Sequence, residues 1–155
     1  MQTQQTTLNN GLRIVTCSRP NTETVSLGIW IKTGSAYEDE KINGISHFLE
    51  HMVFKGTKNR TSLQISEEIE NVGGQNNAYT SREFTAFYAK MLKDDTELAL
   101  DVISDLILNP TFPEEELVKE REVVVQEIKQ TIDSPDDIIF AVSYTHLTLP
   151  TNREV

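Results

Sequence analysis

The chain has 155 residues, of which 24 are acidic and 14 basic, so its formal net charge is −10. This length suits one domain with its own hydrophobic core, and the acidic balance disfavours nucleic acids and anionic membrane surfaces as partners. The single cysteine excludes an internal disulfide, and no apolar run approaches the ~20 residues of a membrane-spanning helix. The first residues carry no signal or transit pattern, so a cytoplasmic location is expected.

Strands are expected at the start of the chain. Residues 6–18 and 24–33 are rich in strand-forming residues, and the second range alternates apolar with other side chains. Within the first range, Asn10-Gly11 is a turn signal. Cys17 lies in the same strand-like run, so its side chain is expected to fill core space.

Helices and further strands follow. A helix is expected over residues 44–55, and Thr61 with Gln64 suits a capping box that opens a second helix. Gly73-Gly74 ends that helix, and residues 76–91 predict two strands joined by a turn.

Two more helices are expected in the second half of the chain. The first runs from Asp94 to Leu108, and the second begins at Pro113 and ends near Ser134. This order of strands and helices predicts an α+β fold.

The pentapeptide 47–51 has the pattern H-x-x-E-H. On a helix, His47, Glu50 and His51 share one face, and two imidazoles one turn apart, about 5.4 Å along the axis, can bind one metal ion. The carboxylate beside them stands where a general base belongs. The pattern is the inverse of H-E-x-x-H and is typical of zinc-dependent peptidases.

A plainer interpretation is that these polar residues only make a helix surface soluble. Two of the chain's three histidines lie in the pattern, however, and its neighbours are apolar. They predict a helix buried on most sides, which favours a ligand role because buried polar groups are rarely unpaired. These neighbours are Ile45, Phe48, Leu49, Met52, Val53 and Phe54.

A catalytic zinc site needs a third protein ligand. Cys17 lies too far upstream, and His146 belongs to an unusual C-terminal segment. The acidic helix offers Glu120 and Glu127, which are two turns apart on one face. Spacing does not choose between these glutamates, and a solvated acidic face is the alternative.

Several blocks together resemble the N-terminal part of a pitrilysin/insulinase-type metallopeptidase, closest to the mitochondrial-processing-peptidase-like and bacterial processing-peptidase members. The resemblance spans roughly residues 6–142. The matching blocks are residues 10–13, 34–38, 44–57, 73–74, 77–83 and 120–128.

The resemblance implies a set of site residues. In that family the third ligand is a glutamate about 76 residues after the motif, which corresponds to Glu127, and a second glutamate, here Glu120, orients a ligand histidine. One zinc ion per chain would then be held by His47, His51 and Glu127. Zinc lowers the pKa of a water molecule toward about 7, and Glu50 acts as the general base.

The resemblance also implies the architecture and the partners. We expect an antiparallel or mixed sheet with helices packed on one face, as the N-terminal half-domain of the metallopeptidase clamshell. Asn77-Ala78 would lie at a sheet edge and pair with an extended peptide substrate, although a simple turn after Gly74 is the alternative. The family's C-terminal domain, or a second subunit, would complete the site.

We expect residues 1–142 to be a truncated catalytic domain and residues 143–155 to be a non-native tail. The isolated fragment is then expected to be inactive, although its parent is a zinc metalloendopeptidase. Two alternatives remain open: a non-catalytic core subunit of the same fold, and a non-haem iron site, since two histidines and a carboxylate also suit iron.

Overall fold

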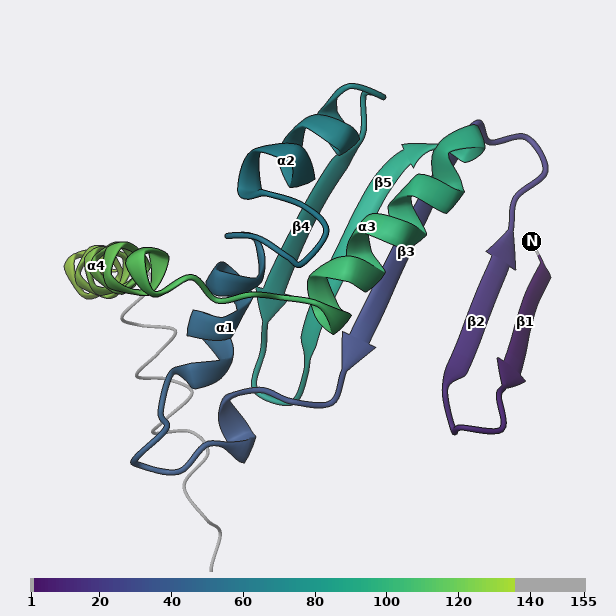
Figure 1. The fold of residues 1–155 in the computed structure, drawn as a ribbon. Helices are drawn as coiled ribbons and strands as arrows, with labels where there is room; N and C mark the ends of the chain where they lie inside the picture. Colours follow the sequence, from purple (N-terminus) through teal and green to yellow (C-terminus); the bar gives the residue numbers. More distant parts are fainter. Residues whose placement is uncertain (1, 136–155) are drawn as a thin grey trace, which may run out of the picture.

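Residues 2–135 form two antiparallel sheets and four α-helices (Figure 1). The structure is a computed structural model and describes residues 2–135. Two short 3-10 helices, η1 and η2, cover Ser35–Tyr37 and Lys93–Asp95. The other elements are β1 (Gln2–Thr7), β2 (Arg13–Ser18), β3 (Thr24–Ile31), α1 (Ile45–Val53), α2 (Ser62–Glu70), β4 (Gln75–Thr80), β5 (Thr85–Leu92), α3 (Thr96–Leu108) and α4 (Glu114–Asp133).

The larger sheet has the strand order β3-β5-β4, with both pairs antiparallel. Phe87 in the central strand lies opposite Ile29 of β3 and opposite Ala78 of β4. Strand β4 is therefore an outer strand, and within residues 2–135 no further strand pairs with its free edge.

Helices α2 and α3 cover one face of this sheet (Figure 1). Ile65 and Ile69 of α2 and Leu106 of α3 are buried against the sheet, where they join Phe87 in the core. Trp30, on the opposite face, is 61% exposed. The predicted α+β fold, with helices on one face of an antiparallel sheet, is confirmed.

Strands β1 and β2 form a separate hairpin around the predicted Asn10-Gly11 turn. Gly11 has a φ of 87°, a conformation that glycine adopts at little cost. All residues of both strands are exposed. The expectation that Cys17 fills core space is wrong, because no described element covers the hairpin and the thiol is exposed.

Local signals placed the helices well. Thr61 and Gln64 form the predicted capping box at the start of α2. Helix α1 is less buried than its apolar sequence predicted, since Ile45 is 39% and Leu49 is 41% exposed. Only one side of α1 faces the sheet, so part of its apolar surface stays uncovered.

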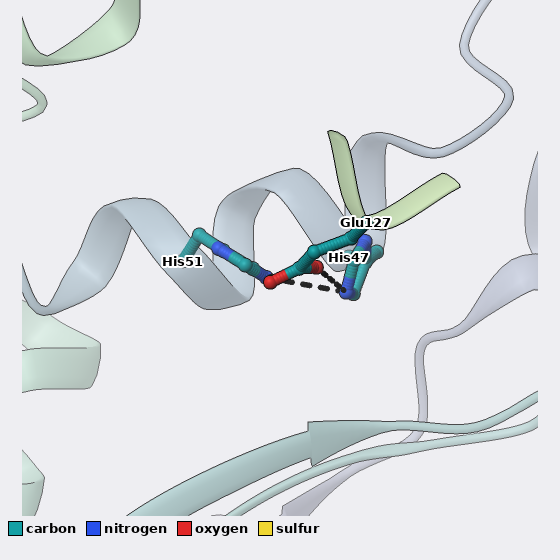
Figure 2. Close-up of side chains that lie close together, drawn as sticks. All are labelled: His47, His51 and Glu127. Carbon is teal, nitrogen blue, oxygen red and sulfur yellow. Dashed lines mark hydrogen bonds and ion pairs between the residues drawn. The ribbon is translucent and has the colours of Figure 1, made fainter. Parts of the chain in front are cut away.

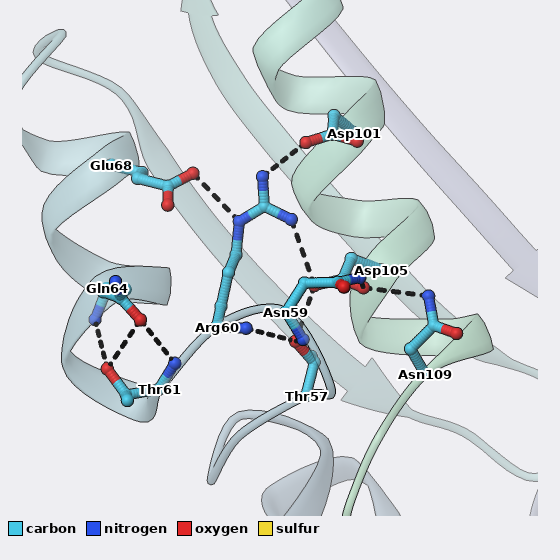
Figure 3. Close-up of polar contacts among 9 residues, drawn as sticks. All are labelled: Thr57, Asn59, Arg60, Thr61, Gln64, Glu68, Asp101, Asp105 and Asn109. Carbon is cyan, nitrogen blue, oxygen red and sulfur yellow. Dashed lines mark hydrogen bonds and ion pairs between the residues drawn. The ribbon is translucent and has the colours of Figure 1, made fainter.

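A buried polar network fastens the loop after α1 to α3 (Figure 3). Asp105 of α3 accepts hydrogen bonds from the Thr57 hydroxyl at 2.6 Å and from Asn59 Nδ2 at 2.6 Å. Arg60 also donates to this carboxylate, at 3.0 Å, and forms an ion pair with Asp101. The loop that follows α1 is therefore bonded to α3 by several polar side chains.

The predicted tail, residues 143–155, lies outside the described residues. Among residues 2–135, no helix is both long enough and apolar enough to cross a membrane.

Candidate metal centre

Helix α1 carries the H-x-x-E-H pattern and lies between strand β4 and helix α4. The Thr80 hydroxyl of β4 donates to the Ser46 carbonyl at 3.4 Å, which ties the first turn of α1 to the sheet. On its other side, α1 contacts α4, the predicted source of the third ligand. The predicted ligands therefore come from two helices that pack against each other.

His47, His51 and Glu127 converge on one point (Figure 2). The Nε2 atoms of the two histidines are 3.2 Å apart. Glu127 Oε2 lies 3.8 Å from His47 Nε2 and 3.5 Å from His51 Nε2. The three side chains lie on neighbouring turns of two helices, where their polar atoms form a small triangle.

The triangle has the size and chemistry of a zinc site. Two nitrogens that each lie 2.0–2.1 Å from a tetrahedral zinc ion are separated by about 3.3 Å, close to the separation of the two Nε2 atoms. Two imidazoles and one carboxylate are a common ligand set for catalytic zinc, which leaves a fourth position for water or substrate. His47 and Glu127 are partly exposed, at 43% and 46% of their side-chain surface, so solvent reaches this side of the triangle.

Glu120 lies behind His51, away from the triangle. Its Oε1 atom is 2.9 Å from His51 Nδ1, and its side chain is only 7% exposed. An ionised carboxylate can only accept, so a neutral His51 donates Nδ1–H to Glu120 and keeps the lone pair on Nε2. That lone pair points toward His47 and Glu127, as a metal ligand requires.

The environment of Glu120 favours its ionised form. Burial opposes ionisation, but the hydrogen bonds from Lys55 and His51 outweigh burial and hold the pKa of Glu120 below its usual range. Lys55 Nζ lies 2.6 Å from Glu120 Oε2. Glu120 is therefore a charged hydrogen-bond acceptor at neutral pH.

A sequence model described as Insulinase (Peptidase family M16) matches residues 13–149, most of the chain. The chain belongs to this family. The matched M16 range ends inside segment 143–155, at residue 149.

Named relatives and a solved structure agree with the M16 assignment. The chain is 50% identical over 133 residues to "Uncharacterized zinc protease YmxG" of Bacillus subtilis (strain 168) and 44% identical over 147 residues to "Mitochondrial-processing peptidase subunit beta" of Rattus norvegicus. These matches cover 86% and 95% of the chain. A crystal structure of a protease from Helicobacter pylori superposes with a TM-score of 0.84 at 29% identity over 90% of the chain.

The chain spans about a third of the length of these proteins. It covers 32% of the Bacillus protein, 29% of the rat subunit and 34% of the Helicobacter protease chain. The part of the chain that the structure describes contains both the H-x-x-E-H motif and Glu127.

Glu50, the predicted general base, lies on the same helix as the two histidines. Its Oε2 atom is buried, and within residues 2–135 it has no hydrogen-bond partner. A buried carboxylate oxygen without a partner is costly. It therefore fits a site whose remaining polar partner is a water molecule or a substrate group.

Asn77 and Ala78, the predicted peptide-binding pair, lie on the outer strand β4. Ala78 is buried at 7% exposure, whereas Asn77 is exposed. The Asn77 side chain accepts the N–H of Ala78 at 2.8 Å. The alternative of a simple turn after Gly74 is wrong, because Gln75–Thr80 is a regular strand paired with β5.

A groove between α1 and α4 lies apart from the three converging residues. It has a volume of about 680 Å³ and is lined by Phe48 of α1 and by α4 side chains that include Leu117, Val118 and Val125. None of the three converging residues lines it. The groove is mostly apolar and lacks a cluster of ligand atoms. The triangle of His47, His51 and Glu127 is therefore the better candidate for a metal site.

Sequence reasoning missed two residues that support the site. Lys55 pairs with Glu120, and Glu38 accepts backbone N–H groups at the start of α1. Lys55 lies four residues after His51, which is a usable helical signal. Glu38 carries no comparable signal, because it lies in the loop that folds back over the helix.

Proposed function

We propose that this chain is part of a zinc-dependent metalloendopeptidase that hydrolyses peptide bonds in extended peptides or presequences. Zinc is held by His47, His51 and Glu127, and Glu50 is the general base. The observation that carries the proposal is the convergence of His47 Nε2, His51 Nε2 and a Glu127 oxygen within 4.8 Å of one another. The names of the M16 relatives, zinc protease and processing peptidase, support the same chemistry.

The chain's residues divide the work of amide hydrolysis. When bound, zinc acts as a Lewis acid that polarises the scissile carbonyl and makes a water molecule more acidic. Glu50 takes a proton from the attacking water and delivers it to the leaving amine. Water thus adds its oxygen to the carbonyl carbon as the C–N bond breaks. Glu120 holds the Nδ1–H tautomer of His51 throughout.

The free edge of β4 provides the peptide-binding surface in this proposal. A substrate that adds a strand to a sheet edge is recognised mainly through its backbone. Asn77 and Ala78 lie on that edge, and β4 packs against α1, which carries Glu50. A bound strand along β4 would therefore run beside the metal-binding helix.

The rest of the enzyme is also a proposal. Residues 1–142 would be the N-terminal catalytic part, and a C-terminal domain or a second subunit would complete the substrate-binding surface. The chain's one-third share of its relatives' length supports this reading. The expected cytoplasmic location stays a prediction.

Zinc content tests the metal site directly. The 155-residue chain and its Glu127→Gln variant are purified and dialysed against trace-metal-free buffer, and zinc is counted per chain. We expect about one zinc in the wild type and far less in the variant, because metal affinity depends on the full ligand set. Glu122→Gln changes an exposed glutamate on the same helix and should keep the zinc.

Two results would contradict the proposed site. One is a folded wild-type chain, judged by circular dichroism, that retains no zinc. The other is equal zinc in the wild type and in Glu127→Gln, which would mean that Glu127 is not a ligand.

A further inference from the structure

Within residues 2–135, helix α4 (Glu114–Asp133) buries little of its surface. Among its twenty residues, all of them described, Glu120 alone is buried. Apolar side chains along the helix are largely exposed, with Val118 at 64% and Ile128 at 53%. Apolar burial therefore does little to fix where α4 sits along α1, although α4 supplies Glu127 to the triangle.

Polar contacts of Glu120 connect α4 to α1 and to the turn that follows α1. Each oxygen of the Glu120 carboxylate has its own partner from the motif segment: His51 Nδ1 at 2.9 Å and Lys55 Nζ at 2.6 Å. Lys55 lies in the turn just after the end of α1 at Val53, and both it and His51 reach Glu120. Both oxygens of the Glu120 carboxylate are thus bound, one by His51 and the other by Lys55.

Lys55 supplies a positive charge beside Glu120, which a neutral His51 does not. A neutral imidazole donates a hydrogen bond but carries no charge, whereas a buried carboxylate is held more firmly in place by a partner of opposite charge. The Lys55 side chain is 27% exposed and that of Glu120 is 7% exposed, so water screens this pair only partly. The Lys93–Glu23 pair, by contrast, is 53% and 75% exposed and should contribute little.

We propose that Lys55 is a positioning residue for the metal centre: by holding the Glu120 carboxylate against His51, it fixes the His51 tautomer and docks α4 so that Glu127 reaches the histidines. Glu120 and Glu127 are two helical turns apart on one face of α4, so fixing the first sets the place of the second. This inference rests on the proposed function, because it assigns Lys55 to the zinc site proposed above. Lys55 is not one of the three converging residues, and its ion pair is with Glu120.

Three variants of the 155-residue chain test this role. Lys55→Met removes the charge and the donor but keeps most of the length, and Lys55→Arg keeps both. Lys58→Met is the matched control, because Lys58 is an exposed lysine three residues further on. Two quantities are measured for each: the Kd for zinc, by competition with a chelator, and the tautomer of His51 in metal-free protein, by long-range ¹H–¹⁵N NMR at a pH where the imidazole is neutral.

We expect Lys55→Met to weaken zinc binding about 10–100-fold, the usual effect of losing a group that orients a ligand. In metal-free Lys55→Met, the His51 resonances should show a mixture of tautomers, whereas wild type, Lys55→Arg and Lys58→Met should show the Nδ1–H form. Lys55→Arg should restore zinc affinity to near the wild-type value. These results would support the positioning role.

An unchanged zinc Kd and an unchanged His51 tautomer in Lys55→Met would overturn the inference while leaving the zinc site intact. If the wild type bound no zinc, the proposed function would fail, but the metal-free NMR comparison would still decide the role of Lys55. Should circular dichroism show Lys55→Met to be unfolded, Lys55→Gln, which keeps a donor without the charge, takes its place with the same two readouts. A wild-type tautomer and Kd in that variant would overturn the need for a charge.

Discussion

The Glu38 carboxylate lies across the N-terminus of α1, where its Oε1 atom accepts the backbone N–H of Ser46 at 2.8 Å. Its other oxygen accepts the N–H of Gly44 at 2.7 Å. The first N–H groups of a helix have no partner within the helix, and a negative charge near them interacts favourably with the helix dipole. Burial opposes ionisation of Glu38, but these hydrogen bonds and the nearby His47 hold its pKa below the usual range.

Replacing Glu38 by alanine should lower the free energy of unfolding at pH 7 by about 1 kcal/mol, as the loss of a helix cap does. The pKa of Glu38 is lower in the folded state, so its contribution is present above the ordinary carboxyl pKa and is lost as the pH falls. Urea unfolding at neutral and at acidic pH measures both effects. Glu40→Ala, at an exposed position nearby, is the control. If Glu38→Ala lowered the free energy of unfolding equally at both pH values, the ionised Glu38 carboxylate would not be the group that caps α1.

Because of the hydrogen bonds to Asp105, the free energy of unfolding should fall as the pH is lowered. Burial opposes ionisation of Asp105, but hydrogen bonds from Thr57, Asn109, Asn59 and Arg60 lower its pKa from 3.8 to about 2. Because the folded pKa is depressed, the unfolded chain binds the proton more tightly. The carboxylate then contributes about 2 kcal/mol at neutral pH, and this contribution is lost as the pH falls from about 4 to about 2.

Asp105→Asn should therefore destabilise the protein by about 2 kcal/mol at pH 7 and by much less near pH 2. Chemical unfolding across this range measures the difference. Asp101→Asn is a matched control, because Asp101 pairs with the same Arg60 but is 67% exposed. Its loss should stay below about 1 kcal/mol. Similar losses for the two variants would show that burial of Asp105 does not matter.

Glu50→Gln should separate zinc binding from catalysis. The amide cannot accept the proton of the attacking water, so kcat on a peptide substrate should fall about 10²–10⁴-fold, measured with the C-terminal domain or second subunit proposed above present. Zinc per chain should not change, because Glu50 is not one of the three converging residues. Glu67→Gln, at an exposed position of α2, is the control. Near-wild-type turnover in Glu50→Gln would remove it as the general base.

Backbone pairing at β4 should be visible with modified peptides. In an extended peptide, alternate amides point toward the same side, so only one set can bond to β4. We expect N-methylation of that set to weaken binding about 2- to 10-fold for each hydrogen bond lost. Methylation of the intervening amides serves as the control. Fluorescence anisotropy in the presence of zinc measures both series, and equal weakening in the two would contradict strand addition.

Local sequence patterns predicted most of the secondary structure. The turn at Asn10-Gly11, the capping box at Thr61 and the start of α4 after Pro113 all occur where expected. Each depends on backbone chemistry within a few residues, which the sequence displays directly. The burial of Cys17 was mispredicted, because strand character does not reveal whether another element covers the strand.

The order of amino acids alone puts His47, Glu50 and His51 on one side of a helix, because the helical period requires it. The same period makes Glu120 and Glu127 equivalent, since both lie on one face of α4. Only the docking of α4 against α1 distinguishes them. It puts Glu120 behind His51 at Nδ1 and Glu127 in front of it at Nε2. Contacts between helices distant in sequence depend on packing and charge pairing in three dimensions, which no local spacing encodes.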